Sequence, residues 1–184
     1  MRFFIALEIP AENRQQLQQI QIQLKGLLPQ VKLTNPEKLH LTIAFIGEQP
    51  DQIKPLLINA ITESVKDIKP FEVTPSYLDG FPNIHEPHII WVGVKGDIDK
   101  LVILRERIKD NLASLNLGVD HRRFEPHIAI AKVQNFHLTR DLEASFQQMM
   151  LQKFDPIQVS FVKLFESIPN HGFHSHNTLA EIQL

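Results

Sequence analysis

The chain has 184 residues and 43% of them are hydrophobic, which is typical of one globular domain with a sizeable core. The absence of cysteine excludes disulfides, thiolate nucleophiles and cysteine-based zinc sites, and it agrees with a cytoplasmic protein. The formal net charge of -2 excludes a protein that binds long nucleic acid through many phosphates, so a nucleic-acid partner should offer only a few, as an RNA end or a small nucleotide does.

The first part of the chain predicts an alternation of strands and helices. Its apolar opening segment is expected to be a strand rather than a signal peptide, because Glu8 interrupts it and no small-residue cleavage site follows. No apolar run approaches the roughly 18 residues that cross a membrane, so we expect no membrane partner. We predict strands at residues 3–9, 31–34 and 39–46, a turn at 35–38, and helices at 11–28 and 51–65.

The second part of the chain repeats this order. A left-handed cap is expected at Gly118, just past the third helix. We predict strands at 71–78, 88–94, 124–133, 156–165 and 178–184, and helices at 98–115 and 138–150. The order β-α-β-β-α-β therefore occurs roughly twice. It predicts an α+β protein with two similar lobes of antiparallel sheet, helices on their outer faces, and one bilobal domain over residues 1–184.

Two short strings in apolar, strand-like runs read almost alike. They are His40-Leu41-Thr42-Ile43 and His127-Ile128-Ala129-Ile130. Each has a histidine followed two positions later by a smaller residue, which leaves room beside the imidazole. Because side chains on a strand alternate between its faces, we expect His40, Thr42 and Ala44 on one face, opposite Phe45, and likewise His127, Ala129 and Ala131. The two strings should line a cleft between the lobes.

A pair of histidines on matching strands can move two protons in one reaction. A single strand histidine is most often only hydrogen-bonded or exposed, but two in matched contexts favour catalysis. The free pKa of histidine is about 6.5, so one neutral and one protonated imidazole can flank a phosphorus atom. The neutral ring takes a proton from the attacking hydroxyl, and the protonated ring gives one to the departing oxygen. This scheme needs no metal.

Four segments carry a resemblance to a known family. They are Arg2 to Leu7, Glu37 to Gly47, Phe81-Pro82, and Arg123 to His127. With the two strings, they resemble the 2H phosphoesterase superfamily and its RNA 2′,3′-cyclic phosphodiesterase branch, also called 2′-5′ RNA ligases. The resemblance covers nearly the whole chain. It implies hydrolysis of a 2′,3′-cyclic phosphate to a 2′-phosphate without a cofactor, by a monomer that acts on RNA ends or small cyclic nucleotides.

The resemblance also implies roles for single residues. His40 would donate a proton to the leaving 3′-oxygen and His127 would activate water, although the sequence alone leaves these two roles interchangeable. The family's threonine hydroxyls bind the non-bridging phosphate oxygens, so Thr42 fits this role while Ala129 holds the motif position without the hydroxyl. Lys132 stands where the family often has arginine. Strand alternation puts it on the face away from His127, unless the strand twists or bulges.

Two further residues have both a functional and an ordinary interpretation. Arg123 is either a phosphate contact at the cleft mouth or a surface charge. Phe4 either stacks a nucleobase or, as is more common for an apolar strand residue, packs in the core.

Two other functions remain as alternatives. The first is a nucleotide- or RNA-end-binding module whose catalysis is weakened because Ala129 lacks the hydroxyl. The second is a metalloenzyme built on the histidines of residues 171–176, which is disfavoured because no carboxylate stands at a useful spacing. A polar loop before the last strand is the simpler interpretation of that segment. The physiological substrate and any role of 2′-5′ ligation stay open.

Overall fold

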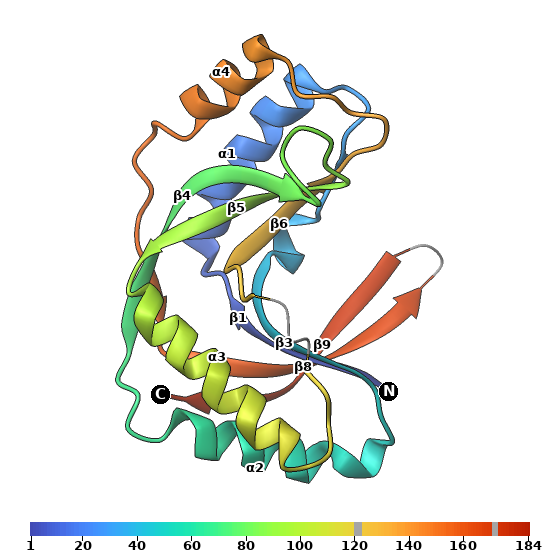
Figure 1. Ribbon diagram of the computed structural model, residues 1–184, viewed down its shortest axis with the longest axis vertical. Helices are drawn as coiled ribbons and strands as arrows, with labels where there is room; N and C mark the ends of the chain where they lie inside the picture. Colours follow the sequence, from blue (N-terminus) through green and yellow to red (C-terminus); the bar gives the residue numbers. More distant parts are fainter. Residues whose placement is uncertain (120–122, 171–172) are drawn as a thin grey trace.

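The computed structural model describes residues 1–119, 123–170 and 173–184, whose strands form one curled antiparallel sheet (Figure 1). The sheet order is β7-β4-β5-β6-β3-β1-β8-β9. Strand β2 lies outside this order and pairs with β6. The strands are β1 (Arg2–Glu8), β2 (Lys32–Leu33), β3 (His40–Glu48), β4 (Phe71–Phe81), β5 (Ile89–Gly96), β6 (His127–Lys132), β7 (Ile157–Val159), β8 (Phe161–Asn170) and β9 (Phe173–Gln183). The α-helices are α1 (Ala11–Leu27), α2 (Lys54–Val65), α3 (Ile98–Ala113) and α4 (Arg140–Met149).

The sheet divides into two lobes that meet at one point. One lobe holds β1, β3, β8 and β9 and is covered by α2 and α3, and the other holds β4 to β7 and is covered by α1 and α4. The paired position between them is Leu41 of β3 opposite Ile128 of β6. The helices lie on the outer, convex side (Figure 1), which confirms the predicted α+β arrangement.

The lobes are not the two halves of the sequence. β1 and α1 follow each other in the chain, yet β1 belongs to one lobe and α1 packs against β6 of the other. The chain therefore crosses the junction repeatedly, and each lobe depends on segments from both ends of the sequence.

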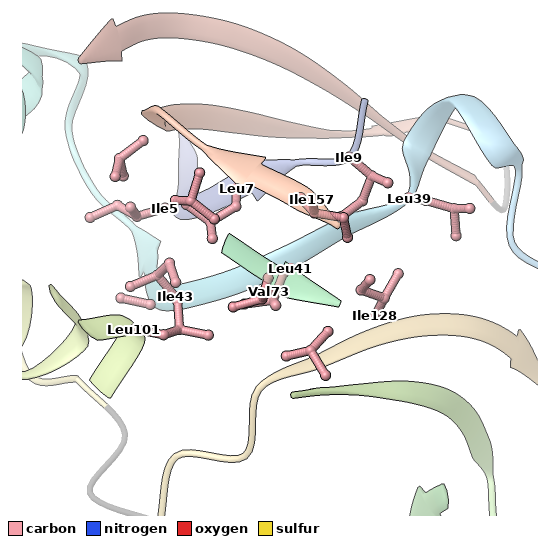
Figure 2. Close-up of a cluster of buried hydrophobic side chains, with 14 of the residues drawn as sticks. Ile5, Leu7, Ile9, Leu39, Leu41, Ile43, Val73, Leu101, Ile128 and Ile157 are labelled. Atoms are coloured by element: carbon pink, nitrogen blue, oxygen red, sulfur yellow. The ribbon is translucent and has the colours of Figure 1, made fainter. Parts of the chain in front are cut away.

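The main core lies between the sheet and the helices. Figure 2 shows part of it, with Leu41 and Ile128 from the junction among the buried side chains. Burying such a side chain stabilises the fold by about 1.5–3 kcal/mol. A second, small cluster of Phe4, Ala6 and Phe165 lies apart from this core. Because β1 alternates, these residues occupy the inner, concave face of the sheet.

The structure corrects several expected boundaries. Strand β6 begins at His127 rather than at residue 124, because Pro126 has no N–H to donate to a ladder. Helix α3 ends at Ala113, so the left-handed residue that follows it is Asn116, with a φ of 58°, and not Gly118. None of the described helices is both long and apolar enough to cross a membrane.

The largest difference is the hairpin of β8 and β9, which continues through a segment predicted as a polar loop. Its strands pair from Phe161 opposite Gln183 to Asn170 opposite Phe173, and in Figure 1 it projects beyond the rest of the sheet. The ladder forms between backbones, so polar side chains such as Ser175 and His176 do not interrupt it. Residues 171 and 172 of the predicted histidine cluster lie outside the described residues.

Candidate active site

The junction of the two lobes brings the two histidine strings together. Leu41 and Ile128 are antiparallel partners, so the residues beside them also face each other across the strands. His40 therefore lies beside Ala129, and Thr42 beside His127. Leu41 and Ile128 point into the core, so all four of these neighbours share the concave face.

Both imidazoles are held by the same backbone contact. Nδ1 of His40 lies 2.7 Å from the carbonyl oxygen of Lys38, and Nδ1 of His127 lies 2.7 Å from that of Glu125. A carbonyl oxygen only accepts hydrogen bonds, so Nδ1 carries the hydrogen in both rings. Nε2 of each ring is then the atom that takes up or releases a proton.

Aromatic side chains enclose each histidine. The His40 ring lies 5.1 Å from the ring centroid of Phe4. The His127 ring lies 4.8 Å from that of Phe81 and 5.5 Å from that of Trp91. These contacts fix the ring planes and limit the access of water.

The enclosure lowers both pKa values. Burial lowers the pKa of His40, the bond to the Lys38 carbonyl opposes this, and the charge of His127 lowers it further. Burial also lowers the pKa of His127, against the opposing effects of the Glu125 carbonyl and carboxylate. The neutral forms are therefore favoured, and a proton on His127 disfavours one on His40. The Glu125 carboxylate thus acts on His127, whereas His40 responds to the positive charge of protonated His127.

The positions two residues after each histidine differ as the sequence indicates. Thr42 and Ala129 are both half-buried on the concave face. The β5 neighbour of Ala129 is Trp91, which is only 2% exposed. Nε1 of Trp91 is buried without a hydrogen-bond partner among the described residues. The second string therefore has neither a hydroxyl nor an accessible indole donor at this point.

A bulge in β6 changes the face of Lys132. Trp91 pairs with Ala129 and Ile90 with Ala131, which leaves Ile130 as the extra residue. Ala131 consequently turns into the core, where it is 1% exposed, and the next residue, Lys132, returns to the face of His127. The face expected for Ala131 was therefore wrong, because a bulge breaks the period of two, and the same bulge is the exception under which Lys132 was expected to share the face of His127.

Strand β3 carries a matching bulge. Ala6 pairs with Thr42 and Ile5 with Ala44, so Ile43 is the extra residue. Ala44 is 3% exposed in the core, and Phe45 turns to the face of Phe4, with the two ring centroids 6.3 Å apart. These placements reverse the ones expected for Ala44 and Phe45.

The remaining candidates lie in different settings. Phe4 is buried, but on the concave face rather than in the main core. Arg123 is exposed in the segment before β6, so no sheet register places it beside the histidines.

Sequence reasoning missed His176. Its ring lies 5.2 Å from that of His40 and 4.9 Å from that of Phe4, with both pairs arranged edge to face. Only the β8–β9 pairing brings this distant residue to the site, so the sequence carried no signal beyond the histidine cluster itself. Within residues 1–119, 123–170 and 173–184, no group of three or more His, Cys, Asp and Glu could hold a metal ion.

The comparisons with known proteins agree with this geometry. A family model described as the 2′-5′ RNA ligase superfamily matches residues 9–165. The chain is similar to an RNA 2′,3′-cyclic phosphodiesterase of Methanocaldococcus jannaschii, with 26% identity over 91% of this chain and 91% of that protein.

Solved structures show the same fold. A Thermus thermophilus protein has a TM-score of 0.80 at 20% identity, covering 100% of this chain and 98% of that one. Escherichia coli LigT complexed with 3′-AMP has a TM-score of 0.78 at 21% identity, covering 100% of this chain and 97% of that one. The family match over most of the chain, together with paired histidine strands at the lobe junction, shows that this protein belongs to the 2′-5′ RNA ligase superfamily.

Proposed function

We propose that this protein hydrolyses 2′,3′-cyclic phosphate ends of RNA or nucleotides to 2′-phosphomonoesters, without a metal. The observation that carries the proposal is the matched pair of imidazoles, each held at Nδ1 by a backbone carbonyl with Nε2 left for proton transfer. The names of the curated relatives support the reaction, and the 3′-AMP complex of LigT supports a nucleotide ligand.

The reaction uses both histidines. A water oxygen bonds to phosphorus as the bond from phosphorus to the 3′-oxygen breaks. The water proton passes to Nε2 of His127, and Nε2–H of His40 gives its proton to the 3′-oxygen, leaving a 2′-phosphate. The Glu125 carboxylate favours the protonated form of His127, whereas the charge of His127 disfavours it in His40. The Glu125 carboxylate would thereby stabilise the imidazolium that forms when His127 takes the water proton, which supports His127 as the base.

Other residues would bind the phosphate. The Thr42 hydroxyl would donate a hydrogen bond to a non-bridging oxygen from its position beside His127. Lys132, on the same face, would supply a positive charge as a point donor without the two-pronged geometry of arginine. Arg123 would add charge at the edge of the site.

We further propose that the protein works as a monomer in the cytoplasm. Both histidine strings come from one chain, so the site needs no residue from a second copy. The cysteine-free composition suits a reducing compartment.

The test is product analysis on 2′,3′-cyclic AMP and on a short RNA with a 2′,3′-cyclic end. The wild-type protein should give only the 2′-phosphate, with and without EDTA. His40→Ala and His127→Ala should each lower kcat about 10²- to 10⁴-fold, the usual contribution of one general acid or base. Binding of either ligand without turnover would instead support the binding module, for which the missing hydroxyl at Ala129 is the favouring observation.

A further inference from the structure

The short segment that leads into β6 is held by side chains from two other elements. The guanidinium carbon of Arg105, in α3, lies 5.6 Å from the ring centroid of Phe124. The hydroxyl of Tyr77, in β4, donates to Oε1 of Glu125 at 3.2 Å. The carbonyl of the same Glu125 accepts the bond from Nδ1 of His127. One residue thus joins the Tyr77 hydroxyl to the His127 ring.

The position of Tyr77 depends on a glycine. Tyr77 and His127 are both partners of Gly93, on opposite sides of β5. A Cβ at Gly93 would lie 2.1 Å from the Tyr77 ring, so the ring lies directly over this residue. The Tyr77 ring also meets the Trp91 ring edge to face at 5.8 Å, and Trp91 in turn contacts His127. Tyr77 is therefore seated next to the second histidine string.

We propose that Tyr77 and Glu125 are a positioning pair for His127. Tyr77 fixes the side-chain carboxylate of Glu125, whose negative charge stabilises the protonated form of His127. The backbone carbonyl of Glu125 orients the imidazole. The residue at the same place before His40 is Lys38, so the two strings differ in the charge of the residue that holds each ring. The pair thus stabilises the imidazolium that forms when His127 takes the water proton. This inference rests on the proposed hydrolysis.

The electrostatic surroundings agree with this assignment. Partial burial raises the pKa of Tyr77, and the charges of Glu125 and Asp79 raise it further, so its hydroxyl stays protonated and donates. The titratable group that acts on His127 is Glu125, and the charge of His127 in turn acts on His40. Its other neighbours, Phe81 and Trp91, are uncharged.

Two variants separate charge from hydrogen bonding. Glu125→Gln keeps an acceptor for Tyr77 and keeps the backbone carbonyl, but it removes the negative charge. The acid limb of kcat/KM against pH, measured on 2′,3′-cyclic AMP, should then move to lower pH, because protonated His127 loses its stabilisation. Tyr77→Phe keeps the ring over Gly93 and should lower kcat about 3- to 10-fold, the loss of one hydrogen bond.

The two effects should be non-additive in the double variant, since both act through one contact. Glu72→Gln, on the same strand as Tyr77, is the matched control and should leave the pH profile unchanged. An unchanged acid limb in Glu125→Gln, or additive effects in the double variant, would overturn the proposal.

An NMR titration of the His127 ring keeps the test independent of activity. In Glu125→Gln the ring should titrate at lower pH than in the wild type, whether or not either protein turns over substrate. A protein that is inactive but shows this difference contradicts the proposed hydrolysis and retains the positioning pair. Identical titrations contradict the pair alone.

Discussion

At the scale of single residues, the two strings are similar in backbone and different in chemistry. The first carries a hydroxyl at Thr42 and an aromatic ring at Phe45, whereas the second carries Ala129 and Lys132 at the same places. Matching bulges bring Phe45 and Lys132 to the concave face. The candidate site therefore combines one hydroxyl with one cation in place of two hydroxyls.

Restoring that hydroxyl should make the enzyme faster. A hydrogen bond to a charged group contributes about 1.5–3 kcal/mol, so Ala129→Thr should raise kcat/KM on a cyclic nucleotide about 10- to 150-fold. Thr42→Ala is the matched control and should lower kcat/KM by a similar factor. A flat or reduced kcat/KM in a well-folded Ala129→Thr protein would show that the hydroxyl is not what the second string lacks.

At the scale of elements, the sequence predicted what depends on local periodicity. Apolar spacing located all four α-helices, and turn residues separated most strands. The bulges at Ile43 and Ile130 were not predictable, because they are defined only by the pairing of each strand with a distant neighbour. His176 and Tyr77 were not predictable for the same reason. His176 reaches the histidines only through the register of β8 with β9, and Tyr77 only through that of β4 with β5. The motifs themselves were visible because strand alternation puts His and the following small residue on one face.

The pairing of β4 with β5 places the Tyr77 ring where a side chain at Gly93 would lie. A Cβ there would meet the Tyr77 ring at 2.1 Å, so Gly93→Ala should destabilise the protein by about 1–3 kcal/mol, the cost of overpacking. Urea denaturation measures this change. In a Tyr77→Ala background the cost should largely disappear, because the ring that creates the clash is gone.

Gly26 is the matched control for this change. It lies in α1 with nothing within 4 Å of an added Cβ, so Gly26→Ala should stabilise the protein by up to about 1 kcal/mol through helix propensity. An equal loss of stability for Gly93→Ala with and without the Tyr77 ring would mean that backbone strain, and not the ring, excludes a side chain at Gly93.

At the scale of the whole molecule, the fold sets up the site by curling one sheet around a single junction. The core residues Leu41 and Ile128 fix that junction, and the same pairing fixes which residues meet on the concave face. Two imidazoles are thereby half-buried on one face of the sheet, so the folded state tolerates protons on them less well than the unfolded chain does. The position of the site therefore affects the stability of the whole protein.

Stability should consequently fall as the pH falls through the histidine range. In the unfolded chain, histidine titrates near a pKa of about 6.5, whereas burial lowers the pKa of both His40 and His127 in the fold. Below about pH 6.5 the unfolded state binds more protons, so the free energy of unfolding decreases until the folded pKa values are passed. Urea denaturation of wild type and His40→Phe at pH 9.5, 8, 6.5 and 5 measures the effect. The variant keeps an aromatic ring beside Phe4 but loses one titrating group. Its free energy of unfolding should therefore fall less than that of the wild type between pH 6.5 and 5. Between pH 8 and 9.5 it should follow the wild-type slope. Equal losses in both proteins below pH 6.5 would mean that other groups cause the acid sensitivity.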